Sequence, residues 1–276
     1  MGGGASKKKV APSPTQSNPS SSPTTSSAMK EGTHQQTIVK KKNNNKPLIT
    51  AQDVLEHLTS EGKLYVQFHF VNLNGELRGM EESADLIPKF ARSGVNIDGS
   101  SIPGCNAVNK SDVRLIPEWD SFIEYDGAAS KDEPSVERIL CTLGDFDKPH
   151  AGCARSVAKR AVKACVDAGL EPWMFGELEW FFLMSDGITP HDHGTYCSLP
   201  PDDRAAMIRH EVAETMLQAG CTVKRIHHEC GPGQNEVELK LQPAMKNMDD
   251  CVTATSIIKS LARKHGIQAT FLPKPL

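Results

Sequence analysis

Residues 227–239 decide the fold of the C-terminal part of the chain, and they read His-His-Glu-Cys-Gly-Pro-Gly-Gln-Asn-Glu-Val-Glu-Leu. The Gly-Pro-Gly triplet at 231–233 is typical of a tight turn. On either side of it the sequence favours strands, over 222–230 and 236–241. The stretch therefore predicts a hairpin.

Acidic residues occupy alternate positions on the second strand of this hairpin. Glu236 and Glu238 share one face of their strand because successive side chains on a strand alternate, and Val237 and Leu239 take the other face. The turn brings Glu229 close to Glu236. We therefore expect three acidic side chains on one face of the hairpin.

A second pair of carboxylates, Glu177 and Glu179, lies in an apolar stretch that predicts a strand over 173–184. The two side chains share a face of that strand for the same reason. Buried carboxylates need cations or hydrogen-bond donors, so one interpretation is salt bridges to Lys or Arg. The other is a metal site.

Several carboxylates on strand faces form a set of hard oxygen ligands, which suits Mg²⁺ or Mn²⁺ and often serves phosphoryl transfer. His227 and His228 are softer candidate ligands. With so many carboxylates and no paired cysteines, zinc is not favoured. The residues alone thus predict a divalent-metal site and leave the substrate open.

The remaining pattern predicts an α+β protein in three parts. Residues 1–46 form a disordered basic tail, rich in Ser, Thr, Pro and Asn. Residues 47–147 form a small domain with a helix that Thr50 caps, a mostly antiparallel sheet and a polar turn at 96–101. Residues 148–276 form a layered or barrel-like α/β arrangement. Its predicted helices are 155–168, 202–219 and 247–265, and its last strand is 267–272.

Charge separates the tail from the body. The 276 residues carry a net charge of −3, but residues 1–46 hold eight lysines against Glu31, which gives +7, and the rest of the chain carries −10. An acidic body argues against a nucleic-acid-binding domain. The eight cysteines are scattered without a C-x-x-C pair, and no apolar run is long enough for a membrane span, so we predict a cytoplasmic protein. Membrane contact is expected only if Gly2, in the sequence Met-Gly-Gly-Gly-Ala-Ser, is myristoylated.

Four ordered motifs resemble type I glutamine synthetases. Residues 227–237 are similar to the family signature H-H-E-x-x-x-G-Q-x-E, and residues 176–182 (Gly-Glu-Leu-Glu-Trp-Phe-Phe) to its carboxylate strand. Residues 98–102 (Asp-Gly-Ser-Ser-Ile) resemble its D-G-S-S loop, and residues 262–275 the helix and strand before its glutamate-binding loop. The resemblance as a whole extends over residues 62–276.

The resemblance implies the fold and the activity of that family. It implies a β-grasp-like N-terminal domain followed by part of a catalytic barrel that neighbouring subunits share in a homo-oligomeric dodecamer. Its members join ammonia to glutamate with ATP through γ-glutamyl phosphate. The substrates would be glutamate, ammonium and ATP, with Mg²⁺ or Mn²⁺ as the metal.

The resemblance also implies roles for single residues. Glu179, Glu229 and Glu236 would hold one metal ion and Glu177 a second. Asp98, together with Ser101, would bind and deprotonate ammonium in a neighbouring subunit's site, with Tyr196 and Glu229 beside it. No catalytic role is assigned to His227 or His228.

Two departures from the family pattern bear on activity. Lys224 stands where the family has a glutamate of the nucleotide pocket, and the family's later metal-binding and substrate-binding residues would follow Leu276. We therefore expect a C-terminally truncated chain that is inactive by itself. Two alternatives stay open, a non-catalytic assembly or regulatory partner of full-length subunits and a related γ-glutamyl–amine ligase.

Overall fold

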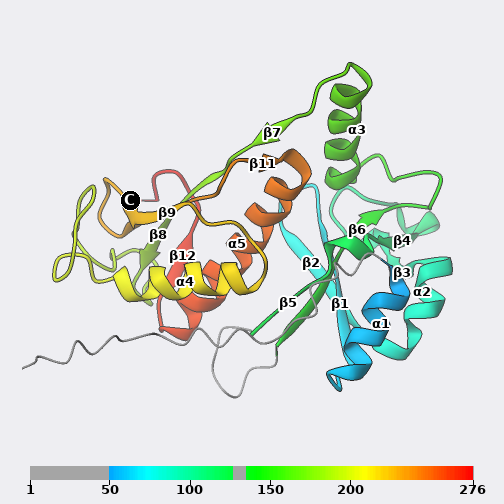
Figure 1. Cartoon of the computed structure of the whole chain (residues 1–276), viewed down its shortest axis with the longest axis horizontal. Coiled ribbons are helices and arrows are strands. Elements are labelled where there is room, and N and C mark those ends of the chain that lie inside the picture. The colour runs from blue at the N-terminus through cyan, green and yellow to red at the C-terminus, as the bar shows by residue number, and fades with distance from the viewer. Residues whose placement is uncertain (1–49, 127–134, 276) are drawn as a thin grey trace, which may run out of the picture. The chain divides into compact units, whose positions relative to one another are not determined.

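The computed structural model describes residues 50–126 and 135–275 (Figure 1). The basic tail predicted at 1–46, with the lipidation motif at Gly2, lies outside the described residues. No helix within these two described ranges has the length and the hydropathy that a membrane span requires.

The first sheet contains six strands and belongs to the N-terminal part of the chain. They are β1 (Tyr65–Val71), β2 (Leu77–Ser83), β3 (Val95–Asp98), β4 (Asp112–Pro117), β5 (Ile123–Tyr125) and β6 (Val136–Leu143). Their order is β2-β1-β6-β4-β3, and β5 also pairs with β6. All pairs are antiparallel except β1 with β6, which is parallel. Strands β1 and β2 form an antiparallel hairpin.

Two helices, α1 (Ala51–Ser60) and α2 (Ile87–Ser93), pack against one face of this sheet. Helix α1 begins as predicted, because the Thr50 side chain accepts a hydrogen bond from the Asp53 backbone and the Asp53 carboxylate accepts one from Thr50 N, a capping box. The core under the helices is apolar, and its largest buried members include Leu58, Phe68, Ile87, Leu115 and Ile139. Helix α2 and strands β4 and β5 were not predicted.

The second sheet has four antiparallel strands in the order β12-β8-β10-β9. They are β8 (Glu177–Leu183), β9 (Arg225–His228), β10 (Gln234–Glu238) and β12 (Gln268–Thr270). Helices α4 (Ala206–Gln218) and α5 (Ala244–Lys264) share a core with this sheet. The core side chains from the strands include Leu178, Trp180, Phe182, Val237 and Leu239, which leaves the alternate residues on the opposite face.

Three further elements lie outside these two sheets. Helix α3 (Ala154–Asp167) follows β6, and the short strands β7 (Trp173–Met174) and β11 (Gln242–Pro243) pair with each other. Four 3₁₀ turns complete the described structure, at Ala84–Leu86, Gly99–Ser101, Val108–Lys110 and Trp119–Ser121.

Some sequence predictions were wrong in detail. The strand predicted over 173–184 is two strands, because the chain breaks at Gly176, where a Cβ atom would lie 2.7 Å from Cys251 Sγ. Part of the polar turn predicted at 96–101 is strand β3, whose polar residues occupy the edge of the first sheet. Helix α3 was expected to bury its apolar face, yet Val157 and Val166 are 49% and 57% exposed.

Candidate functional site

The β9–β10 turn has the conformation that the Gly-Pro-Gly triplet predicts. Gly233 adopts a φ of 68°, which favours glycine, and a Cβ there would lie 2.6 Å from the carbonyl oxygen of Phe182. Gln234 N donates to Gly231 O at 2.9 Å, and Glu229 N donates to Gln234 O at 2.9 Å. The turn therefore fixes Glu229 at the end of β9, next to the start of β10.

Strand register then gathers the acidic residues. On β10, Glu236 lies opposite Glu179 of β8 on one side and opposite His227 of β9 on the other. Glu238 lies opposite Glu177 in the same way. Directly opposite residues on antiparallel strands project to the same face, so all five side chains lie on the face away from the helical core.

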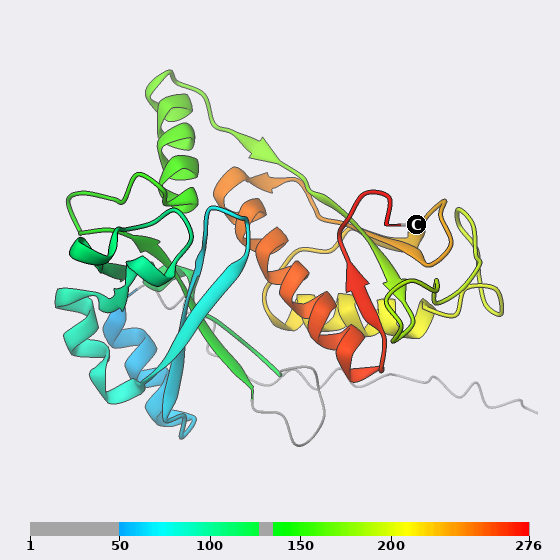
Figure 2. The ribbon, with the colours of Figure 1, turned by 180° about the vertical axis from the view of Figure 1, so that it is seen from behind.

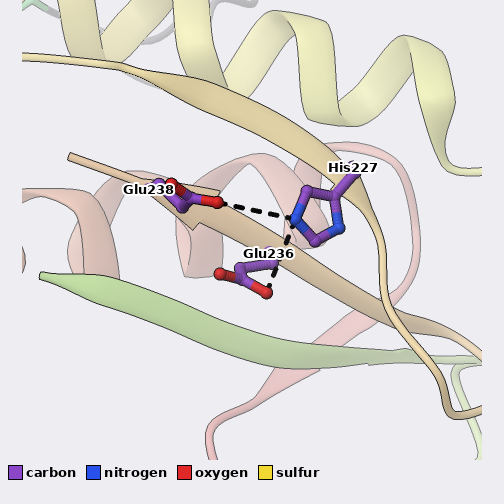
Figure 3. Close-up of side chains that lie close together, drawn as sticks. All are labelled: His227, Glu236 and Glu238. Carbon is purple, nitrogen blue, oxygen red and sulfur yellow. Dashed lines mark ion pairs between the residues drawn. The ribbon is translucent and has the colours of Figure 1, made fainter. Parts of the chain in front are cut away.

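His227, on the edge strand β9, points toward Glu236 and Glu238 (Figure 3). Its Nε2 is 3.6 Å from Glu236 Oε2 and 3.9 Å from Glu238 Oε1, and its Nδ1 is 3.8 Å from Glu229 Oε1. One ligand atom from each of His227, Glu236 and Glu238 lies within 4.8 Å of the other two, a spacing that a metal ion can bridge. The contacts of His227 with three carboxylates were not predicted from the sequence.

The carboxylates repel one another in the absence of a cation. Burial foremost, together with the charges of Glu229, Glu177 and Glu179, raises the pKa of Glu236 to about 7, while His227 opposes the shift. Burial also opposes charge on Glu229, but a 2.7 Å hydrogen bond from Cys230 N holds the pKa of this carboxyl below its ordinary value. The group is therefore suited to a divalent cation, which would relieve this repulsion.

The raised pKa of Glu236 predicts how the stability of the metal-free chain changes with pH. Between pH 4.5 and about 7 the carboxyl of Glu236 keeps its proton in the folded state and loses it in the unfolded state. The free energy of unfolding therefore falls as pH rises through that window. In the Glu236→Gln variant this loss is absent. Urea denaturation in EDTA should therefore show the variant gaining stability relative to the parent chain between pH 5 and pH 8.

The matched control for this measurement is Glu214→Gln, which changes an exposed carboxylate on α4. Its stability should differ from that of the parent chain by the same amount at both pH values. Parallel pH profiles for Glu236→Gln and the parent chain would contradict the assignment of the raised pKa.

Glu238 differs from the other carboxylates because it already has cationic partners. Lys224 Nζ donates to Glu238 Oε2 at 2.6 Å, and Arg225 Nε lies 3.0 Å from Glu238 Oε1. These contacts, Lys224 foremost, hold the pKa of Glu238 below its ordinary value. A metal ion bound at Glu238 would have to displace these contacts. Lys224 also lies 5.7 Å from the ring centroid of Phe175.

Two more side chains border the acidic group. Tyr196 packs edge-on against His227 with ring centroids 5.4 Å apart, so the loop after β8 contributes to the site. Glu179 accepts a 2.6 Å hydrogen bond from Gln234 Nε2, which ties β8 to the β9–β10 turn. Glu177 lies on the same face with an exposed side chain.

Asp98 and Ser101 lie apart from this group, at the edge of the first sheet. The Asp98 carboxylate accepts hydrogen bonds from Ser100 Oγ at 2.6 Å and from Ser101 Oγ at 3.0 Å, and these bonds, that of Ser100 foremost, lower its pKa. Among the described residues, no hydrogen bond or ion pair joins Asp98 to the carboxylates of the second sheet.

Buried polar contacts anchor the loop that carries Tyr196. His228 is fully buried, and its Nε2 lies 2.8 Å from Asp192 Oδ1, which also accepts a hydrogen bond from Gly233 N at 3.1 Å. His228 therefore points away from the acidic face and joins the loop to the β9–β10 turn. The sequence alone could not separate its role from that of His227.

A second buried contact joins the same loop to β10. Arg209 of α4 forms an ion pair with Asp203 and donates to the side chain of Asn235. The three residues are 5%, 3% and 0% exposed. Because Asn235 directly precedes Glu236, this network helps to fix the strand that carries the central carboxylate.

Family comparisons match both sheets. Residues 63–144 match the family model described as glutamine synthetase, beta-Grasp domain, and residues 151–276 match the one described as glutamine synthetase, catalytic domain. The chain belongs to the glutamine synthetase family. The α+β fold expected from the sequence is thereby confirmed, with a β-grasp domain followed by the curled sheet that holds the carboxylates.

Curated relatives in this family are longer than the chain. A glutamine synthetase of Pyrococcus abyssi is 30% identical over 215 residues, which are 77% of this chain and 48% of that protein. One of Staphylococcus aureus strain Mu50 is 29% identical over 238 residues, 84% of this chain and 53% of that protein. The chain thus spans about half the length of the curated relatives it matches.

Solved structures agree on the fold. The cryo-EM structure of Plasmodium falciparum glutamine synthetase superposes with a TM-score of 0.73 at 20% identity, covering 82% of this chain and 51% of that one. A structure titled as a GmaS complex with ADP superposes with a TM-score of 0.70 at 23% identity, covering 81% of this chain and 52% of that one. At these identities the likeness concerns the fold alone.

Proposed function

We propose that the site serves the ATP-dependent ligation of ammonia to glutamate through γ-glutamyl phosphate. The observation that carries this proposal is the acidic face of the second sheet, where Glu177, Glu179 and Glu236 meet across two strands and Glu229 closes the turn. Membership of the glutamine synthetase family supports it. The substrates would be glutamate, ammonium and ATP.

The carboxylates would hold the metal ions that this reaction needs. Glu179, Glu229 and Glu236 would bind one Mg²⁺ or Mn²⁺, and Glu177 would contribute to a second. Such an ion supplies charge neutralisation and polarisation at the phosphoryl group that is transferred. The carboxylates supply fixed positions for the ions, because register and the Gly233 turn set their spacing before a cation binds.

Asp98 would act on ammonium. The hydrogen bonds from Ser100 and Ser101 keep its carboxylate charged, so it can attract the ammonium cation. The same bonds lower its basicity, so deprotonation of ammonium by Asp98 would need a further acceptor or the loss of these bonds. Asp98 lies in the first sheet, and within residues 50–126 and 135–275 no hydrogen bond or ion pair joins it to the acidic face. We therefore propose, as the family resemblance implies, that it serves the site of a neighbouring subunit in a dodecamer, where Tyr196 and Glu229 would lie beside the ammonium.

The proposal predicts metal-dependent glutamine formation by a fusion of this chain with the remaining half of the Pyrococcus abyssi relative. The assay follows ¹⁵N from ammonium into the amide of glutamine by mass spectrometry. In the fusion, Glu179→Gln should lower turnover by at least about a hundredfold, and Glu214→Gln should leave it unchanged. The 276-residue chain alone is predicted to form no glutamine.

Each alternative gives a different result in this assay. A folded fusion that binds Mn²⁺ and forms no glutamine would contradict the ligase proposal, and consumption of methylamine in place of ammonium would favour a γ-glutamyl–amine ligase. Assembly with full-length subunits without turnover would favour a non-catalytic partner. The cytoplasmic location and the lipid anchor at Gly2 stay predictions.

A further inference from the structure

A large cavity lies between the β1–β2 hairpin and helix α5, away from the acidic face. Its volume is about 690 Å³, and Figure 2 shows the hairpin and the helix side by side. Cavities of this size accept small molecules. The polar side chains that matter for its chemistry are His69, Arg78, Thr255, Ser256, Lys259 and Ser260.

The mouth of this cavity is basic. Arg78 is paired with Glu76 at 2.8 Å, so its charge is partly compensated. Lys259 has no ion pair with any described residue and instead lies 5.6 Å from the ring centroid of Phe271. Its ammonium group is therefore available to an anion.

A buried arginine lies behind the cavity wall. Arg138 of β6 is 3% exposed, and its Nη2 donates to Thr253 Oγ1 of α5, while its buried Nη1 has no hydrogen-bond partner. The nearest compensating carboxylate is that of Asp249, but both of its oxygens contact Arg155. A buried charge without a partner of its own is costly, so this position favours an anion nearby.

His69 connects the buried arginine with the cavity. It lines the cavity, and its Nδ1 is buried without a hydrogen-bond partner. Burial, together with the charge of Arg138, lowers the pKa of His69 to about 4. Its ring lies over Gly79, where a Cβ would come within 2.3 Å of the imidazole, so the ring is held in place. The imidazole therefore forms a fixed part of the cavity wall.

We propose that this cavity binds a small anion that carries carboxylate or phosphate groups. Arg78 and Lys259 outnumber Glu76, the one acidic side chain of the lining, which interacts with both, and hydroxyl groups of α5 line the same space. Arg138 adds a positive charge behind the wall without lining the cavity. Together they offer the charged and neutral donors that oxyanions prefer. The inference is independent of the ligase proposal, because none of these residues belongs to the acidic face.

Calorimetric titration of the whole chain with inorganic phosphate and, separately, with glutarate tests this inference. The chain is first stripped of metal with a chelating resin and the buffer contains no polycarboxylate, so no metal ion can hold either anion at the carboxylate site. We expect saturable binding of at least one anion, and Lys259→Gln should weaken it by at least about tenfold. The control Lys148→Gln removes an exposed lysine outside the cavity and should leave the affinity unchanged.

A second variant tests the buried charge. Arg138→Gln keeps a donor for Thr253 and removes the charge, so bound anion should raise its melting temperature less than that of the parent chain. Binding of phosphate alone would indicate a phosphorylated ligand, and binding of glutarate alone a carboxylate. Absence of binding by either anion, or equal affinities in the parent chain and Lys259→Gln, would overturn the proposal.

Discussion

Replacing Glu236 by glutamine should lower the affinity of the chain for Mn²⁺ by at least about a hundredfold, since loss of a direct ligand exceeds the usual cost of losing an outer-sphere partner. Glu236 lies between Glu179 and His227, and its neighbours would each lose the shared cation if this carboxylate were absent. Electron paramagnetic resonance of free Mn²⁺ measures the affinity directly. The fold should survive, because the change also removes carboxylate repulsion.

Glu238→Gln provides the sharper comparison. This carboxylate is already paired with Lys224 and Arg225, so its loss should weaken Mn²⁺ binding by less than about tenfold. Glu214→Gln, on the exposed side of α4, should have no effect. If Glu238→Gln proved as damaging as Glu236→Gln, the ligands would instead be the trio of His227, Glu236 and Glu238.

Arg209→Ala should destabilise the chain by about 3–5 kcal/mol. The substitution leaves the Asp203 carboxylate, whose side chain is 1% exposed, buried without its cationic partner, and it also removes a donor to Asn235. Urea denaturation followed by circular dichroism measures the change. Arg204→Ala removes an exposed arginine five residues earlier and should change the free energy of unfolding by about 0.5 kcal/mol or less.

A double variant separates the charge from the packing. Asp203→Ala combined with Arg209→Ala removes both charges, so it should cost less than the sum of the two single substitutions. Additive losses would mean that the two side chains stabilise the loop independently. In that case the ion pair is not what holds the Tyr196 loop against β10.

The sequence predicted the acidic face well because strand alternation is a local property. The spacing of Glu177 with Glu179, and of Glu236 with Glu238, was enough to place each pair on one side of a strand. Gly231 and Gly233 marked the turn between β9 and β10.

The alternation of side chains along one strand does not determine the register between strands. Which residue of β8 lies opposite Glu236 depends on hydrogen bonds between strands more than fifty residues apart in sequence. For the same reason the sequence did not reveal that His227 contacts three carboxylates while the adjacent His228 is buried. The cationic partners of Glu238 were likewise hidden, since Lys224 stood out only as a departure from the family pattern.

Tertiary packing also overrode the amphipathic pattern of α3. Its sequence has apolar residues at helical spacing, and the helix forms as predicted. Yet Val157 and Val166 stay largely exposed, and Ser156 is the one buried residue of this helix. The spacing of apolar residues predicted that α3 is a helix, but it could not predict which of its side chains are buried.

The parallel pairing of β1 with β6 has a consequence for the order of folding. Phe68 lies beside Ile139, so this ladder joins segments separated by about seventy residues, and closing such a loop costs conformational entropy. The local β1–β2 and β9–β10 hairpins can form within about 1–10 microseconds. We therefore expect the first sheet to stay open during synthesis until β6 has left the ribosome, and its closure to be the slow, topology-limited step for this half of the chain.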